Sequence, residues 1–191
     1  MTILAVNGSP RASGATAYLI GQVLDGARAA GAETQLFRLG EMDVSPCTAC
    51  MGCKKTVRCV IDDDMEGFYD AVESAGEPKG LVIGTPIYFD HVSAQLKAWL
   101  DRLYCYTYTE RGEKMFPPGF RAVLVAPWGW DKADAYVSVV DWLEARLRGY
   151  HEIETLGSVC LPGADSRPLH ERTEEAARAR ELGRLLAESA T

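Results

Sequence analysis

The sequence predicts an α/β domain, residues 1–191, in which helices cover both faces of a five-stranded parallel sheet. Five short apolar segments alternate with five segments whose apolar residues recur every three or four positions, the spacing of one face of a helix. A chain of 191 residues corresponds to one domain. These elements in this length fit a doubly wound open sheet better than an eight-stranded barrel.

The first half of the chain contains three predicted strands. Residues 2–6 are an apolar strand, and the helix at 14–30 follows because its apolar residues share one face: Leu19, Val23, Ala27 and Ala30. Residues 34–39 are the second strand. The alternation of strand and helix is then interrupted by a cysteine-bearing loop. A helix is expected over 64–74, because aspartates at its start favour a helix N-terminus.

The second half continues the same alternation. Residues 80–84 form a continuous apolar strand, and Ser93 is expected to cap a helix that contains Leu96, Leu100 and Leu103. The remaining elements are a strand at 121–126, a helix over 136–147, a strand at 154–160 and a helix over 179–190. The predicted order is flavodoxin-like, and in such sheets ligands bind where the strand order reverses, at the loops after strands one, three and four.

Composition and charge exclude several classes of protein. Hydrophobic residues make up 47% and charged residues 25% of the chain, which excludes a disordered chain. The net charge of −7 has the wrong sign for a general nucleic-acid binder. The longest stretch without Asp, Glu, Lys or Arg has 13 residues, 12–24, whereas a membrane span needs about 20 apolar residues. Because no secretory signal opens the sequence, a cytoplasmic location with reduced cysteines is expected.

The loop at 7–16 joins the first strand to its helix and is a candidate phosphate site. It contains two glycines, three hydroxyl side chains and one arginine, and the N–H groups at a helix N-terminus bind phosphate. The loop matches neither the Walker pattern nor the dinucleotide fingerprint of three glycines. Taken alone, it is equally compatible with a turn that binds no ligand.

A second segment, Gly84-Thr85-Pro86-Ile87-Tyr88-Phe89, ends the third strand. Together with Gly-Ser-Pro-Arg at 8–11 and the following 93–102, it resembles the NADPH-dependent FMN reductase family of flavodoxin-like proteins, over roughly residues 2–103. The resemblance implies that the FMN phosphate lies on Ser9, Arg11, Ser13 and Thr16. Ala15 stands where the family usually has Asn, which removes a side-chain contact and leaves the backbone donors.

The flavin ring needs a flat apolar wall with a few polar groups beside it. The resemblance implies that this wall is Pro86, Ile87, Tyr88 and Phe89. Core packing at a strand end is the alternative for the two aromatic residues. Trp128 and Gly129, in the loop after the fourth strand, are further candidates for flavin contact. Packing or a subunit interface is the alternative for Trp128 and for Trp130.

Four of the six cysteines fall within 13 residues, in the pattern C-x2-C-x2-C-x5-C: Cys47, Cys50, Cys53 and Cys59. Two-residue spacings resemble the ferredoxin run, whereas structural zinc sites usually pair two C-x-x-C segments over a longer gap. Five intervening residues reach up to ~20 Å, so Cys59 can fold back onto the same centre. Zinc, free thiols and disulfide-forming thiols remain alternatives.

The cysteines and the following Asp63-Asp64-Met65 are similar to the iron–sulfur flavoprotein branch of the same family. That resemblance implies a 4Fe-4S cluster next to FMN and a homodimer or homotetramer. Seven aromatic residues over 104–130 are expected at the subunit contact: Tyr104, Tyr106, Tyr108, Phe116, Phe120, Trp128 and Trp130.

The expected function is therefore that of an FMN oxidoreductase that passes electrons from NAD(P)H or ferredoxin to a small acceptor. The sequence singles out no catalytic residue. The alternatives are a cluster-free NAD(P)H-dependent FMN or quinone reductase, and a non-catalytic electron carrier or thiol redox sensor.

Overall fold

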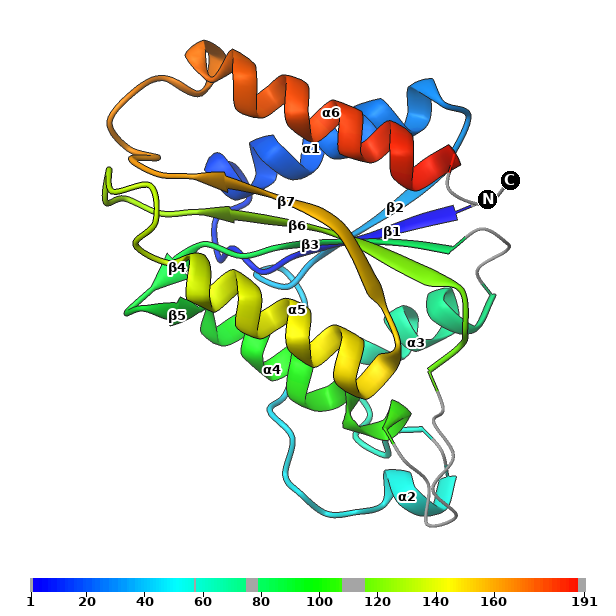
Figure 1. Ribbon diagram of the computed structural model, residues 1–191. Helices are drawn as coiled ribbons and strands as arrows, with labels where there is room; N and C mark the ends of the chain where they lie inside the picture. Colours follow the sequence, from blue (N-terminus) through cyan, green and yellow to red (C-terminus); the bar gives the residue numbers. More distant parts are fainter. Residues whose placement is uncertain (1, 57, 75–78, 108–115, 189–191) are drawn as a thin grey trace.

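The computed structural model describes residues 2–56, 58–74, 79–107 and 116–188. Its centre is a parallel sheet in the order β2-β1-β3-β6-β7 (Figure 1). The strands are β1 (Thr2–Asn7), β2 (Glu33–Arg38), β3 (Lys79–Gly84), β6 (Phe120–Pro127) and β7 (Glu154–Leu161). Chain order and spatial order are those of the flavodoxin-like sheet, so the predicted fold class is confirmed.

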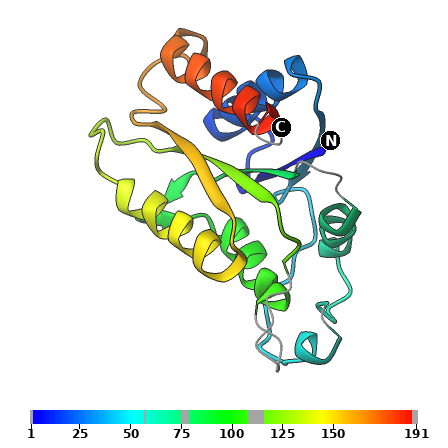
Figure 2. The same cartoon turned by 45° about the vertical axis from the view of Figure 1, so that its right-hand side comes forward.

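Helices cover both faces of the sheet, and each face has its own apolar core. Helices α1 (Ala15–Ala29) and α6 (Thr173–Glu188) lie on one face, and α3 (Met65–Ser74), α4 (Ala94–Arg102) and α5 (Val137–His151) lie on the other (Figure 2). The first core contains Leu19, Val82 and Leu182, and the second contains Phe68, Leu81 and Trp99. The sheet is therefore buried on both sides, which explains its continuous apolar strands.

The bounds of these elements agree with the predicted ones to within a few residues, except that α6 begins at Thr173, in a polar first turn that carries no apolar spacing. The unpredicted elements are short: strands β4 (Ile87–Tyr88) and β5 (His91–Val92), helix α2 (Cys53–Thr56), and the 3-10 turns η1 (Leu103–Tyr106) and η2 (Leu169–Glu171). Each is too short to show a period. None of the helices in the described ranges is both long and apolar enough to cross a membrane.

Helices α1 and α6 approach so closely that glycine is needed on both. A Cβ at Gly26 would lie 1.9 Å from the Arg180 carbonyl oxygen, and a Cβ at Gly183 would lie 1.9 Å from the Val23 carbonyl oxygen. Backbone atoms cannot yield as a flexible side chain can. A Cβ at Gly21, on the same helix α1, would meet nothing within 4 Å.

These two glycines of α1 make a matched test of the contact. Gly26→Ala should destabilise the protein by about 2–3 kcal/mol through overpacking, which lowers Tm by roughly 4–10 °C. Gly21→Ala should raise Tm by about 2–4 °C, because alanine is the better helix former by ~1 kcal/mol. Differential scanning calorimetry measures both, and equal shifts of Tm would contradict the close packing.

Candidate functional site

Three loops meet at the carboxyl edge of the sheet, where the strand order reverses between β1 and β3. The Gly8 N–H donates to the Gly84 carbonyl over 2.8 Å, which joins the loop after β1 to the last residue of β3. The Thr85 N–H donates to the Val125 carbonyl of β6 over 3.0 Å. The backbone therefore ties the loop after β1 to the end of β3, and the start of the loop after β3 to β6.

Ser93 connects these loops to helix α4. Its Oγ donates to the Gly8 carbonyl over 2.5 Å and accepts the Leu96 N–H over 3.1 Å, so the side chain caps α4 as predicted. Its own N–H donates to Thr85 Oγ1 over 3.0 Å. Gly8 has no room for a side chain, because a Cβ would lie 2.8 Å from the Leu96 Cβ. The hydroxyl and the backbone N–H of the buried Ser93 together connect the loop after β1, the loop after β3 and α4.

Hydrogen bonds between side chains and backbone groups within the loop after β1 hold its turn before α1. The Ser9 N–H donates to Asn7 Oδ1 over 2.9 Å, and the Arg11 N–H donates to Ser9 Oγ over 3.1 Å. Gly14 precedes α1 with a φ of 145°, and no side chain caps this helix end within the described part of the chain. Ser9 and Thr16 are buried, Ala15 is half-buried, and Arg11 and Ser13 are exposed. The helix end therefore offers backbone donors to an anion.

The four residues predicted to contact the flavin ring, in the segment after β3, differ in their exposure to solvent. Pro86 and Ile87 are buried, whereas Tyr88 and Phe89 are exposed. Phe89 and Asp90 form the turn between β4 and β5 with φ values of 48° and 60°, in the left-handed region that non-glycine residues rarely occupy. Such strain is concentrated at functional sites. The hairpin therefore presents an aromatic ring to solvent in a strained conformation.

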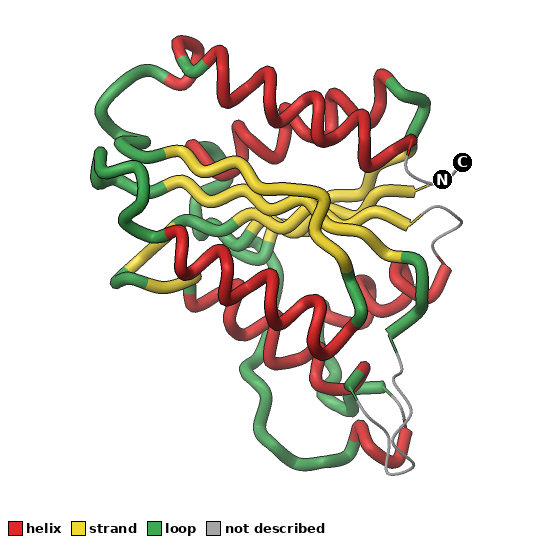
Figure 3. The backbone as a smooth tube through the Cα atoms, viewed as in Figure 1, coloured by secondary structure: helices red, strands yellow, loops and turns green. Residues whose placement is uncertain are grey.

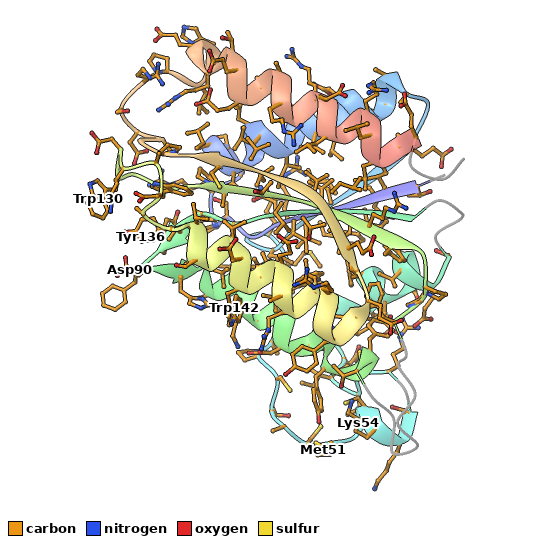
Figure 4. The ribbon with its side chains drawn as sticks, in the orientation of Figure 1. Met51, Lys54, Asp90, Trp130, Tyr136 and Trp142 are labelled. Atoms are coloured by element: carbon orange, nitrogen blue, oxygen red, sulfur yellow. The ribbon has the colours of Figure 1, made fainter. Side chains whose placement is uncertain are left out.

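Asp90 also contacts the loop after β6. A hydrogen bond to Asp90 raises the pKa of the Tyr136 phenol. Figure 4 shows Asp90, Tyr136 and Trp130 at the carboxyl edge of the sheet. Trp128 is buried there, and its indole Nε1 donates to the Lys132 carbonyl over 3.2 Å. The Trp128 side chain is thus packed within the chain, whereas Trp130 and Gly129 are exposed.

The cysteine-bearing loop runs from β2 to α3 and extends below α4 in Figures 1 and 3. Cys47 and Cys50 are exposed, and Cys53 and Cys59 are half-buried. A hydrogen bond from the Gly52 backbone N–H lowers the pKa of the Cys50 thiol. Burial raises the pKa of the Cys53 thiol.

These four thiols are the donor set that an iron–sulfur cluster requires. They are not gathered around one centre: in the described residues, no group of three or more His, Cys, Asp or Glu is arranged to hold a metal ion. The four thiols therefore have the chemistry that the cluster requires, although their sulfurs are not arranged around a common point in the described residues. All six cysteines are free thiols, and burial raises the pKa of Cys105, outside the motif, to about 12.

Arg102, at the end of α4, fastens this loop to the body of the protein. Its guanidinium is fully buried and pairs with Asp63, with Nη1 at 2.5 Å from Oδ2 and Nη2 at 3.0 Å from Oδ1. Burial alone would raise the pKa of Asp63, but hydrogen bonds from Arg102, Met65 and Ser45 outweigh it and lower that pKa. The Arg102 Nε–H points at Cys59 Sγ, 3.1 Å away.

Sequence reasoning missed Arg102 and the bond between Asp90 and Tyr136. The signal for Arg102 was its position, since it follows Trp99 by three residues and precedes Leu103, on the buried face of α4. A charged residue on such a face requires a partner in the core. Sequence spacing gives no comparable signal for Asp90 and Tyr136, which come from distant segments.

A cavity of about 550 Å³ lies between the cysteine loop, α4 and α5. Its lining is mostly apolar and includes Cys47, Met51, Tyr104, Trp142 and Tyr150. It contains no residue of the loop after β1 or of 86–89. A pronounced hollow therefore lies beside the cysteines.

The aromatic residues expected at a subunit contact mostly pack inside the chain. Tyr106, Phe116 and Phe120 are buried and stack edge to face at 5.2 Å, and Trp128 is buried as well. Tyr104 and Trp130 are exposed, and Tyr108 lies outside the described residues. The homo-oligomer and the roles of the individual site residues stay predictions.

Comparison with known proteins identifies relatives for this arrangement. The model of one family, described as NADPH-dependent FMN reductase, matches residues 1–126. Iron–sulfur flavoproteins of Methanocaldococcus jannaschii, Methanosarcina thermophila and Archaeoglobus fulgidus are 35%, 37% and 40% identical over 102, 102 and 100 residues. These matches cover 53%, 53% and 52% of this chain and 51%, 52% and 49% of the relatives. The chain spans about half the length of the curated relatives it matches.

Solved structures share the fold at low identity. An NAD(P)H:quinone oxidoreductase from Methanothermobacter marburgensis matches with a TM-score of 0.76 and 18% identity, over 97% of this chain and 96% of that one. An FMN-dependent NADH-azoreductase from Bacillus anthracis, solved with FMN, matches with a TM-score of 0.65 and 16% identity, over 100% and 99%. These matches support the flavodoxin-like fold.

The bridging role of Ser93 can be tested by stability. Ser93→Ala removes a helix cap and leaves the buried Gly8 carbonyl without its donor, so it should cost about 2 kcal/mol and lower Tm by roughly 4–8 °C. Ser138→Ala is the control, because Ser138 is exposed in the first turn of α5. If calorimetry gave the same Tm for both variants, the proposed role of Ser93 in connecting the loops to α4 would be contradicted.

Proposed function

The chain belongs to the NADPH-dependent FMN reductase family, and we propose that it is a flavin-dependent oxidoreductase that binds FMN at the carboxyl edge of its sheet. One observation carries the proposal: hydrogen bonds join the loop after β1 to the end of β3, and join Thr85, just after β3, to β6, beside the point where the strand order reverses. This is where open α/β sheets bind their ligands.

In this proposal each loop has a separate task. The loop after β1 and the first turn of α1 hold the FMN phosphate through backbone N–H groups and through Ser9, Arg11, Ser13, Ala15 and Thr16. The segment after β3 and the loop after β6 surround the flavin ring with Pro86, Ile87, Tyr88, Phe89, Trp128 and Gly129. For Trp128 the contact is through the backbone, because its indole is packed.

The finer proposal is that Cys47, Cys50, Cys53 and Cys59 bind a 4Fe-4S cluster. FMN exchanges one or two electrons and the cluster exchanges one, so the pair suits a protein that divides or collects electrons. We propose ferredoxin or NAD(P)H as donor, a small molecule as acceptor, a homodimer or homotetramer, and a cytoplasmic location. The identity of the curated relatives as iron–sulfur flavoproteins supports the cluster.

A cluster-free NAD(P)H-dependent reductase is the second candidate. It is favoured by the arrangement of the four sulfurs, which are not gathered around one centre in the described residues. In that case the hydride donor stacks directly on the flavin, and the cysteines take no part in turnover.

The cofactor content of protein purified without oxygen tests the proposal. Mass spectrometry of the released flavin should identify FMN, because the single phosphate loop leaves no place for the adenylate half of FAD. Iron and acid-labile sulfide should be present in equal amounts. FAD as the main flavin would contradict the first statement, and FMN without iron would leave the cluster-free reductase.

Steady-state assays on the same preparation separate an enzyme from a carrier. Oxidation of NAD(P)H or of reduced ferredoxin with an added quinone should continue over many turnovers. A single turnover per flavin with every donor and acceptor would indicate an electron carrier or a redox sensor.

Replacement of Cys59, the ligand least constrained by spacing, tests the four-ligand arrangement. Cys59→Ala should lose most iron and sulfide, keep near-normal FMN, and turn from brown to yellow. Cys160→Ala is the matched control, since Cys160 is also half-buried but lies on β7. Full iron and sulfide in Cys59→Ala would exclude Cys59 as a ligand.

A further inference from the structure

We infer that Arg102 is a positioning residue for the cluster: its buried guanidinium closes the cysteine loop at its base and donates a hydrogen bond to the sulfur of Cys59. The inference rests on the proposed function, since it concerns a ligand of the proposed cluster. FMN binding does not explain why Arg102 is buried, whereas a role at the cysteine loop does.

The position of Arg102 is unusual for an arginine. Its side chain is 0% exposed and that of Asp63 is 2% exposed. Removing two charges from water is costly, and replacing a buried ion pair by apolar residues is often neutral or stabilising. A contribution to folding stability therefore does not by itself explain the buried Arg102–Asp63 pair. The other groups that the guanidinium contacts indicate its role.

Those groups lie on both stems of the cysteine loop. Nη1 donates to the Ser45 carbonyl over 2.9 Å, two residues before Cys47, and Nη2 donates to the Ile61 carbonyl over 3.3 Å, two residues after Cys59. Asp63, held by the same guanidinium, accepts the Ser45 N–H over 3.1 Å. The two ends of the cysteine motif are thereby brought together on one side chain.

A guanidinium has five N–H donors, and Arg102 uses all of them. Two go to Asp63, one to Ser45, one to Ile61, and the last, on Nε, goes to Cys59 Sγ over 3.1 Å. Because the group is planar and rigid, the first four bonds fix the direction of the fifth. The Nε–H is thus aimed at the sulfur of Cys59.

This hydrogen bond has a definite consequence for a bound cluster. Hydrogen bonds to ligand sulfurs help set the reduction potential of iron–sulfur clusters, and outer-sphere partners of metal ligands commonly contribute 10–100-fold to metal affinity. A positive donor at Cys59 stabilises the more negative, reduced form. Arg102 should therefore raise the reduction potential and slow the loss of iron.

Lysine at position 102 separates this role from the ion pair. Arg102→Lys keeps the charge opposite Asp63 but cannot supply the planar set of five donors. Arg58→Lys is the control, because Arg58 lies in the same loop, between Cys53 and Cys59, and its guanidinium contacts Asp70 and the Glu66 carbonyl. Both variants conserve charge, so a difference between them reports the hydrogen bonds of Arg102.

The experiment uses full-length protein purified without oxygen. In Arg102→Lys, iron should pass to an external chelator at least ~10-fold faster than in the wild type, and the cluster potential should shift to more negative values, with FMN retained. Arg58→Lys should match the wild type in both. Wild-type potential and wild-type iron loss in Arg102→Lys would overturn the inference, and a wild type without iron would overturn the proposed cluster as well.

A spectroscopic measurement covers the case in which Arg102→Lys fails to fold. Wild-type protein labelled with ¹⁵N-arginine should show a weak nitrogen coupling to the reduced cluster in pulsed paramagnetic resonance, and Arg58→Lys should retain it. Absence of this coupling in the labelled wild type would contradict the hydrogen bond directly.

Discussion

Helix α4 is anchored by buried hydrogen bonds at both ends, and both candidate sites depend on that constraint. Ser93 at its N-terminus binds the Gly8 carbonyl and fixes the loops at the carboxyl edge of the sheet. Arg102 at its C-terminus binds both stems of the cysteine loop. Nine helical residues at 1.5 Å each separate these anchors by about 14 Å along the helix axis. The helix thus acts as a rigid spacer between the proposed flavin edge and the cysteines.

The two sites differ in how firmly the chain forms them. At the sheet edge, backbone hydrogen bonds and the buried Ser93 hold the backbone in place, whereas the side chains of Tyr88 and Phe89 are exposed. At the cysteine loop the base is closed by Arg102 and Asp63, but Cys47 and Cys50 at the far end are exposed. In a net acidic chain, Lys54 and Arg58 lie between Cys53 and Cys59 in the sequence, and Arg102 Nε lies 3.1 Å from Cys59 Sγ.

The sequence predicted what depends on local periodicity and short motifs. The five parallel strands, their helices and the Ser93 cap follow from apolar spacing and from one side chain acting within its own turn. The β4–β5 hairpin was not predictable, because two-residue strands have no period and its turn places Phe89 and Asp90 at positive φ without a glycine. The Arg102 pair joins residues 39 positions apart, and only the folded chain brings them together.

We propose that the cysteine loop beside α4 is a four-thiolate site for an iron–sulfur cluster in a flavin-binding chain. X-ray absorption at the iron edge of the protein purified without oxygen tests it most directly, because it reports the atoms bound to iron. Each iron should have sulfur atoms as its nearest neighbours and other irons just beyond them. A first shell of oxygen and nitrogen, or sulfur neighbours without a second iron, would contradict the claim.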